Sequence, residues 1–179
     1  MRRALFLDRD GTLNAEVNYL RRPEDLVLIG GAARALREAR QHGWAVVVVT
    51  NQAGVARGLI PPEALVAIHA KLVAELAREQ VTLDGIYVCV HHPDAGCRCR
   101  KPEPGLLLTA AAELGIDLTC SWMIGDRETD LEAGRRAGCR TALVLTGYGQ
   151  TTAASGYPAD LIAPDLAGAV QRILNGGAA

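Results

Sequence analysis

The chain has 179 residues, of which 49% are apolar and 22% are charged, and this length corresponds to about one ordinary domain. Such a chain can bury a core without covalent staples, so intrinsic disorder, a collagen repeat and a disulfide-stabilised miniprotein are excluded. Nineteen Lys and Arg residues against 20 Asp and Glu residues give a net charge of -1, which provides no general attraction to nucleic acid or to an anionic membrane.

The sequence also lacks the signals of membrane insertion and export. No apolar run approaches the roughly 18 residues that a membrane span requires. The apolar stretch near the N-terminus ends at a charge cluster, too early for a signal peptide. We therefore expect a cytoplasmic protein with no nucleic-acid or membrane partner, and nothing in the sequence calls for more than a monomer.

Short apolar segments alternate with segments of helical period along the whole chain. Strands are expected at residues 4–7, 45–49, 86–90, 122–124 and 141–145, and helices at 32–41, from about 61 onward, 105–114, 129–137 and 165–174. Apolar strands that alternate with helices predict a parallel sheet covered on both faces. We expect a three-layer α/β/α, Rossmann-like fold, with residues 1–175 as a single domain and 176–179 as a frayed tail.

Polar residues stand where the predicted strands end. Asp8 and Asp10 follow the first strand, Thr50 follows the second, Asp126 follows the fourth, and Lys101 precedes a helix. In parallel sheets, ligands bind beyond the carboxyl ends of the strands. Taken singly, each motif has a structural reading as a turn or a helix cap, but their conjunction favours a shared site.

The chemistry of these residues is that of phosphoryl transfer. Converging carboxylates repel one another, and Mg²⁺ relieves that repulsion while binding phosphate oxygens. The ammonium group of Lys101 and the hydroxyl of Thr50 can donate to the same phosphate. One carboxylate can attack phosphorus, and another can protonate the leaving alkoxide and later deprotonate the attacking water.

These motifs, Asp8-x-Asp10-Gly-Thr, Thr50-Asn51-Gln52, Lys101-Pro102 and Gly125-Asp126, resemble the four motifs of the haloacid dehalogenase superfamily of phosphatases. The resemblance covers nearly the whole chain. It implies a haloacid dehalogenase-type fold, with Asp8 as nucleophile, Asp10 as general acid and base, and Thr50 and Lys101 on the phosphoryl group. The intervals between the motifs hold no segment large enough for an inserted cap domain, so we expect none. Asp8, the main-chain carbonyl of Asp10 and Asp126 would hold Mg²⁺. Asp130 would either support these groups or remain a solvated helix carboxylate.

A cysteine-rich segment at residues 89–101 indicates a second metal. Because alternate residues of an extended chain share a face, Cys89 pairs with His91, and Cys97 pairs with Cys99. Three thiolates and one imidazole form a closed structural zinc site, which would hold the next residues at the mouth of the active site. The alternative is a set of unmetallated cysteines or a disulfide. His92 is expected to point away from the site.

Within the superfamily, residues 50–58, 84–93 and 99–105 resemble heptose 1,7-bisphosphate phosphatases. This resemblance implies hydrolysis of the 7-phosphate of a small phosphorylated sugar in lipopolysaccharide or nucleotide-sugar biosynthesis. The substrate contacts that it implies are Arg9, Glu16, Val17, Asn18, Tyr19, Asn51, Gln52, Ala53, Arg100 and Arg127.

Three alternatives remain open. Histidinol-phosphate phosphatases share the zinc loop and the short interval between Cys89 and Cys97, and Val90 and Arg127 depart from the usual heptose pattern. A regulatory phospho-acceptor domain also gathers carboxylates, Thr and Lys at strand ends, although its acceptor Asp is expected after a central strand, a place that we assign to Thr50. A zinc-stabilised interaction module with an inactive site is the third.

Overall fold

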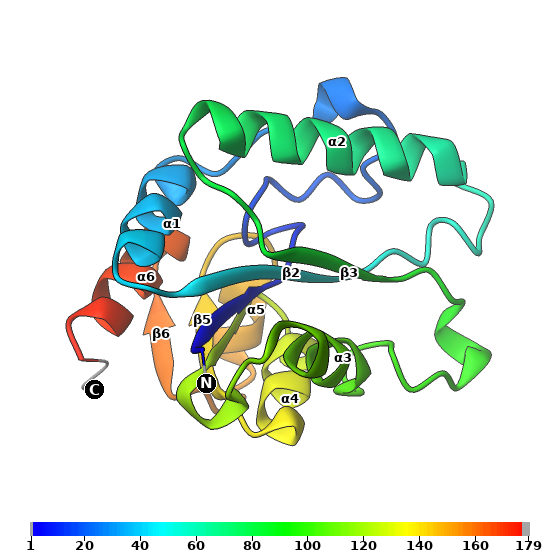
Figure 1. Ribbon diagram of the computed structural model, residues 1–179. Coiled ribbons are helices and arrows are strands. Elements are labelled where there is room, and N and C mark those ends of the chain that lie inside the picture. Colours follow the sequence, from blue (N-terminus) through cyan, green and yellow to red (C-terminus); the bar gives the residue numbers. More distant parts are fainter. Residues whose placement is uncertain (1, 177–179) are drawn as a thin grey trace.

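The sheet at the centre of the molecule has six strands in the order β3-β2-β1-β4-β5-β6, and every neighbouring pair is parallel (Figure 1). The structure is a computed structural model that describes residues 2–176, so residues 177–179 of the expected tail lie outside the described residues. The strands are β1 (Ala4–Leu7), β2 (Ala45–Asn51), β3 (Gly85–Cys89), β4 (Trp122–Gly125), β5 (Arg140–Val144) and β6 (Leu161–Ala163).

Helices cover both faces of this sheet, which confirms the predicted three-layer α/β/α fold. One face is covered by α1 (Ala32–Gln41), α2 (Pro62–Arg78) and α6 (Leu166–Leu174), and the other by α3 (Gly105–Leu114) and α4 (Glu128–Ala137). Figure 1 shows α2 above the sheet and α3 and α4 below it. The shorter helices are α5 (Gly149–Ala154), which follows β5, and single 3-10 turns at Pro23–Asp25, Pro93–Ala95 and Leu118–Cys120.

Side chains alternate between two cores, one on each face of the sheet. The parallel register sets Phe6 of β1 opposite Val47 of β2 and Met123 of β4, and all three pack toward α3 and α4. The next residue, Leu7, packs into the core beneath α1, α2 and α6. Because both faces are covered, the central strands are apolar until their carboxyl ends, which is the pattern that made them predictable.

The boundaries of several elements differ from those expected. The second strand continues through Thr50 and Asn51, because these residues pair in register with Val88 and Cys89 of β3. Thr50 is therefore a strand residue and does not follow the strand. The sequence reading also missed β6 and α5, which are three and six residues long.

The parallel arrangement gives the sheet two different edges. The carboxyl ends of the strands meet at one edge, where Asp8 follows β1 and Asp126 follows β4. Both ends of the described chain lie toward the opposite edge, because residue 2 precedes β1 and α6 runs back alongside α1 after β6 (Figure 1). None of the helices in the described part of the chain is long and apolar enough to cross a membrane.

Candidate active site

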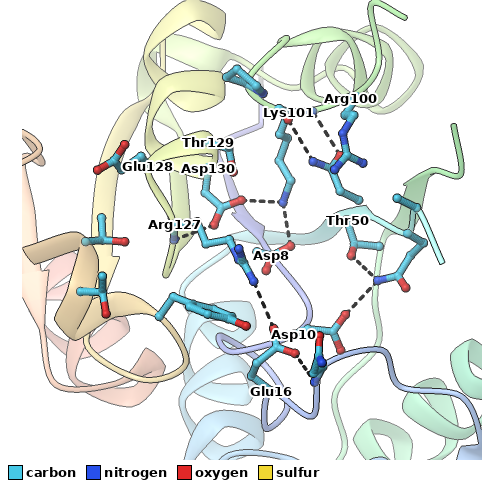
Figure 2. A pocket seen from close by; sticks show the side chains of 18 of the residues that line it. Asp8, Asp10, Glu16, Thr50, Arg100, Lys101, Arg127, Glu128, Thr129 and Asp130 are labelled. Atoms are coloured by element: carbon cyan, nitrogen blue, oxygen red, sulfur yellow. Dashed lines mark hydrogen bonds and ion pairs between the residues drawn. The ribbon is translucent and has the colours of Figure 1, made fainter. Parts of the chain in front are cut away.

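Lys101 lies at the centre of the site, with its ammonium group between two carboxylates. Its Nζ donates to Asp8 Oδ1 and to the Val49 carbonyl, each at 2.7 Å, and it lies 2.7 Å from Asp130 Oδ1 (Figure 2). The side chain is only 1% exposed. Burial alone lowers the pKa of a lysine, but Asp130 and Asp8 outweigh it and raise the pKa of Lys101 above its usual value. Lys101 is therefore a fixed cation at the strand edge.

Asp130 belongs to this site, although the sequence left its role open. It lies in the first turn of α4, where its Oδ2 accepts a hydrogen bond from the Arg127 N–H at 3.0 Å. The residue is 1% exposed, which excludes the reading as a solvated helix carboxylate. Its other oxygen pairs with Lys101, so the start of α4 orients it toward the carboxyl edge of the sheet.

Asp126 completes a group of three carboxylates. Asp8, Asp126 and Asp130 each offer one oxygen, and these oxygens all lie within 4.8 Å of one another. Asp126 Oδ2 accepts a hydrogen bond from the Tyr148 N–H at 2.7 Å, whereas Oδ1 is buried and has no hydrogen-bond partner within residues 2–176. The sequence predicted that Asp8 and Asp126 would converge here, and the structure places Asp130 beside them.

The electrostatics of the carboxylate group call for more positive charge than Lys101 supplies. Burial and the neighbouring charge of Asp130 raise the pKa of Asp126 to about 7. Burial also raises the pKa of Asp8, although Lys101 opposes that rise. Three carboxyl groups, one of them with a buried oxygen that has no partner among the described residues, offer oxygen atoms that suit a hard divalent cation such as Mg²⁺.

Gly11 shows why the Asp-x-Asp motif continues with glycine. Its backbone has a φ of +85°, which is a left-handed conformation that other residues adopt at a cost. A Cβ atom at this position would also collide with the carboxylate of Asp126. Glycine therefore lets the turn after β1 approach the carboxylate that follows β4.

Asp10 is held on both of its carboxylate oxygens by neighbouring donors. Arg9 Nε and Nη2 donate to Oδ1 and Oδ2 at 3.2 and 2.7 Å, Asn14 Nδ2 donates to Oδ1 at 3.0 Å, and Gln52 Nε2 donates to Oδ2 at 2.8 Å. Burial raises the pKa of Asp10, but Arg9 and these hydrogen bonds outweigh it and hold the pKa below its usual value. Asp10 is therefore ionised in this arrangement.

The structure places Arg9 away from the position that the family resemblance implied. Arg9 is fully buried and is not among the residues that line the cavity described below. Its guanidinium group faces Asp10 and His69 instead of a substrate. The expected substrate contact at Arg9 is therefore corrected to an internal ion pair, which a buried guanidinium requires.

The side chains of the Thr50-Asn51-Gln52 motif form hydrogen bonds with Asp10 and with the backbone of Lys101. Gln52 Nε2 donates to Asp10 and also to Thr50 Oγ1 at 2.9 Å. Asn51 binds the backbone of Lys101 twice, since its Nδ2 donates to the Lys101 carbonyl at 3.0 Å and its Oδ1 accepts from the Lys101 N–H at 3.1 Å. The side chains of Asn51 and Gln52 thus fix other residues of the site, in addition to lining it.

A cavity of about 660 Å³ opens above these groups, which is a suitable volume for a small-molecule ligand. Of the residues expected from the sequence at the phosphate and substrate site, Arg9, Val17 and the fully buried Asp126 do not line it. The expected residues that do line it are Asp8, Asp10, Glu16, Asn18, Tyr19, Thr50, Asn51, Gln52, Ala53, Arg100, Lys101 and Arg127. Those that the sequence did not single out include Glu128, Thr129, Tyr148, Thr151, Thr152 and Ser155.

The segment from Glu16 to Tyr19 has an unusual backbone at the mouth of this cavity. Asn18 and Tyr19 both have positive φ values, 49° and 71°. Two contacts hold the turn, because Glu16 Oε1 accepts from the Asn18 N–H at 2.7 Å and Arg57 donates to the Tyr19 hydroxyl at 2.6 Å. Strained backbone of this kind is concentrated at ligand-binding loops.

Arg127 forms part of the outer wall of the cavity. Its guanidinium carbon lies 3.6 Å from the centroid of the Tyr148 ring, and its Nη2 lies 3.7 Å from Glu16 Oε2 (Figure 2). Tyr148, which was not singled out from the sequence, lies beside Arg127 at the start of α5. This contact could not be predicted from the sequence, because Arg127 and Tyr148 lie on different loops that meet only in the folded structure.

The cysteine segment forms a compact four-residue cluster. The distances are 3.6 Å between Cys89 Sγ and His91 Nδ1, 3.7 Å between Cys89 and Cys97, 3.2 Å between His91 and Cys99, and 3.5 Å between Cys99 and Cys97. These thiols are free, which removes the disulfide alternative. The edges agree with a tetrahedron whose metal–sulfur bonds are about 2.3 Å, so the cluster can hold one ion. His92 points elsewhere and accepts a hydrogen bond from the Asp94 N–H.

Comparison with known proteins shows which proteins this chain is similar to. Residues 98–169 match a family model described as HAD-hydrolase-like, where HAD stands for haloacid dehalogenase. The chain is 44% identical over 172 residues to the D-glycero-beta-D-manno-heptose-1,7-bisphosphate 7-phosphatase of Photorhabdus laumondii, covering 92% of this chain and 91% of the relative. It is 41% identical to the enzyme of the same name from Pseudomonas putida, covering 95% and 98% of the two chains.

Solved structures agree with the sequence comparison. The crystal structure of D,D-heptose 1,7-bisphosphate phosphatase from B. bronchiseptica, complexed with magnesium and phosphate, superposes with a TM-score of 0.92 at 37% identity. The superposition covers 97% of this chain and 98% of the other. A beta-phosphoglucomutase from Clostridium difficile superposes with a TM-score of 0.65 at 11% identity, which shows a shared fold.

Proposed function

Because the chain belongs to the family of D-glycero-beta-D-manno-heptose-1,7-bisphosphate 7-phosphatases among the haloacid dehalogenase-like hydrolases, we propose that it hydrolyses the 7-phosphate of that bisphosphate. It is a phosphoric monoester hydrolase. The observation that carries the proposal is the Asp8 carboxylate, held 2.7 Å from Lys101 at the edge of the cavity. The same geometry supplies a nucleophile and a cation for the phosphoryl group.

We assign the magnesium site to Asp8 and Asp126, with Asp130 beside them and the main-chain carbonyl of Asp10 as the further expected ligand. The orphaned Asp126 Oδ1 supports this assignment, because a buried carboxylate oxygen without a partner is costly. When bound, Mg²⁺ supplies charge stabilisation for the phosphate oxygens and relieves repulsion among the carboxylates.

The residues of the chain carry out two displacements at phosphorus. In the first, the Asp8 carboxylate attacks phosphorus, the bond to the sugar oxygen breaks, and Asp10 gives a proton to that oxygen. Asp10, ionised in the free protein, takes up this proton from solvent water when the anionic ester arrives, because a nearby negative charge raises the pKa of a carboxyl group. Lys101 and Thr50 donate to the phosphoryl oxygens as negative charge develops.

The second displacement regenerates the enzyme. Water attacks the aspartyl phosphate and loses a proton to Asp10, and the bond between phosphorus and Asp8 breaks to release inorganic phosphate. Asp8 is then a free carboxylate again, so one chain can turn over many substrate molecules.

A second phosphate on the substrate fits the outer cavity. Arg100 and Arg127 both line it, and Arg100 Nη1 is buried with no hydrogen-bond partner among the residues that the structure describes. A guanidinium group pairs with phosphate through two parallel hydrogen bonds. Two arginines beyond Lys101 therefore favour a bisphosphate substrate over a monophosphate such as histidinol phosphate.

We assign a structural zinc ion to Cys89, His91, Cys97 and Cys99. Four protein ligands leave no open position, so this metal would stabilise the loop and take no part in the reaction. Cys99 is followed directly by Arg100 and Lys101, so a metal here fixes the loop that carries both cations. Because such thiols persist in reducing compartments, we place the enzyme in the cytoplasm.

Strand position does not distinguish a phosphatase from a phospho-acceptor domain. The acceptor Asp of such a domain is expected after a central strand, the place assigned to Thr50, but β1 is itself central, with β2 and β4 on its two sides. Asp8 therefore occupies the position that a phospho-acceptor would need. The family relationship to named phosphatases, and not the topology, favours turnover over a stable phosphorylation.

The proposal is tested by phosphate release from the heptose 1,7-bisphosphate, with histidinol phosphate as the competing substrate, each with and without Mg²⁺. We expect multiple turnovers on the bisphosphate, release of the 7-phosphate, and a loss of about a thousandfold or more in Asp8→Asn, which is nearly isosteric. Asp165→Asn is the matched control, because Asp165 caps α6 through the Gly168 N–H and asparagine caps equally well. Full turnover by Asp8→Asn, or a preference for histidinol phosphate, would contradict the proposal.

A further inference from the structure

Arg9, the buried cation that contacts Asp10, has a further partner outside the Asp8-x-Asp10 motif. Arg9 uses Nε and Nη2 on Asp10, and its remaining terminal nitrogen, Nη1, lies 3.0 Å from His69 Nε2. Arg9 is 0% exposed, so each of its donors needs a partner within the protein. His69 is therefore a partner of the buried cation that orients Asp10.

His69 is well placed to fix that cation. It lies in the middle of α2, and its neighbour Ile68 and the next-turn residue Leu72 are both fully buried in the core beneath this helix. The position of the imidazole is thus set by the packing of α2 on the sheet. A contact from this ring transmits the position of the helix to the loop after β1.

The direction of the hydrogen bond defines the state of the ring. A guanidinium group has only donors, so Nε2 of His69 accepts and the ring proton resides on Nδ1. Burial and the charge of Arg9 lower the pKa of His69 to about 4, which is consistent with a neutral ring. An imidazolium ring at this position would instead face a like charge.

We propose that His69 is a positioning residue, which, as a neutral hydrogen-bond acceptor, holds Arg9 against Asp10 and so sets the orientation of the Asp10 carboxylate. The kinetic consequence rests on the proposed function, in which Asp10 protonates the leaving oxygen. A proton donor must lie within hydrogen-bonding distance of the oxygen that it serves, and a displacement of about 1 Å can cost on the order of a hundredfold in rate.

Two substitutions at this position separate the hydrogen bond from the packing. His69→Leu fills much of the same space but removes the acceptor, whereas His69→Gln restores an oxygen acceptor at about the reach of Nε2. Ile68→Val is the control, because it weakens the core under the same helix without touching Arg9. All three are compared with the wild type by kcat/KM, which covers the steps up to departure of the alcohol.

Two esters report on the proton that Asp10 delivers. The sugar bisphosphate is an alkyl phosphate, and its poor leaving group needs this proton. The p-nitrophenolate of p-nitrophenyl phosphate is a good leaving group and departs readily without it. We expect His69→Leu to lose on the order of tenfold or more in kcat/KM on the sugar phosphate and less than about threefold on the nitrophenyl ester. His69→Gln should recover most of this loss. Ile68→Val should lower the melting temperature but change kcat/KM by the same factor on both esters.

Equal losses on the two esters in His69→Leu, or no loss on either, would overturn the inference. A second measurement is independent of activity: the ¹⁵N shifts of the His69 ring in the wild type, assigned by comparison with His69→Gln, should show a neutral ring with its proton on Nδ1. A protonated ring at neutral pH, or a proton on Nε2, would also overturn it. If the wild type hydrolyses neither ester, the proposed function fails, and the ring measurement still decides the role of His69.

Discussion

At Lys101 the chain buries an ammonium group between Asp8 and Asp130, 2.7 Å from each. Removal of this cation leaves buried carboxylates without compensation, and such a loss typically costs about 3–5 kcal/mol. We expect Lys101→Met to lower the free energy of unfolding by about that amount in the absence of Mg²⁺, as measured by urea titration, and to abolish phosphate release.

The matched control for Lys101→Met lies on the surface of α2. Lys71 pairs with Glu75 at the same 2.7 Å, but its side chain is 37% exposed. Exposed pairs along a helix contribute about 0.3–0.5 kcal/mol, so Lys71→Met should cost less than about 1 kcal/mol and leave activity unchanged. Equal costs for the two substitutions would show that burial does not set the strength of the Lys101 pairs.

Asp84 makes the stability of the protein depend on pH. Burial raises the pKa of this carboxyl, but the Val46 N–H, Arg2 and Arg40 outweigh it and hold the pKa below its usual value. A pKa that is depressed in the folded state contributes stability above the unfolded value of about 3.8, and the contribution is lost as the pH falls through the folded value.

Asp84→Asn should therefore lower stability most at neutral pH, and the difference from the wild type should shrink as the pH falls below about 4. Urea titrations at several pH values between 7 and 3 measure this difference. Glu79→Gln is the control, because Glu79 is exposed. A difference between Asp84→Asn and the wild type that is constant with pH would contradict the role assigned to the Asp84 charge.

Among the elements, the cysteine loop makes the most specific demand. We expect the purified protein to contain one zinc ion per chain by elemental analysis, and Cys99→Ser to lose most of it. Because Cys99 precedes Arg100 and Lys101, loss of the metal should leave these two cations poorly positioned and raise KM roughly tenfold. The far-ultraviolet circular dichroism spectrum should remain native.

Cys120→Ser is the control for the loop, since Cys120 is exposed and lies outside the cluster. It should keep both zinc and activity. Zinc below about a tenth of an equivalent in freshly purified wild type, or normal kinetics in a zinc-free Cys99→Ser, would show that the loop does not depend on the metal.

The elements that could be predicted from the sequence are those with a long, strong pattern. The Val-rich strand β2 and the amphipathic α1 were found because burial on both faces or on one face leaves a clear signature. The missed β6 has three residues with Ile162 45% exposed, and the missed α5 begins with glycine and has two threonines in six residues. Segments this short take their conformation from tertiary contacts.

The same distinction applies to the site. The residues singled out by the motifs, such as Asp8 and Thr50 at strand ends and Lys101 before a helix, line one cavity, so their convergence could be predicted. For Asp130 the sequence left a supporting role and a solvated position both open, and only the packing of α4 decides between them. His69 could not be predicted, because it approaches Arg9 through packing that no spacing along the chain reveals. Arg9 shows the converse error, since its place in a motif suggested a substrate contact, while its burial gives it an internal partner.

At the scale of the whole molecule, the two cores share one sheet, and this predicts a single unfolding transition. Leu36 of α1 and Leu107 of α3 are fully buried on opposite faces. We expect Leu36→Ala and Leu107→Ala each to lower the free energy of unfolding by about 2–5 kcal/mol. Both should shift the same transition, as followed by circular dichroism and tryptophan fluorescence together.

The control for these core substitutions is Val66→Ala, whose side chain is 69% exposed and which should cost less than about 0.5 kcal/mol. Separate transitions for the two probes, or a variant that melts one helix layer while the other stays folded, would contradict the view of residues 1–175 as one domain.

Because all strands run in the same direction, the two ends of the described chain lie at the opposite edge of the sheet from the carboxylate group. Residue 2 and the end of α6 both lie toward the amino edge of the sheet, and the carboxylate group lies at the carboxyl edge. A fluorescent label, a solid support or a fused protein joined at residue 2 or at residue 176 would consequently extend away from the entrance used by metabolites. Enzyme anchored to a bead through either of these positions should keep the catalytic efficiency of the freely diffusing form.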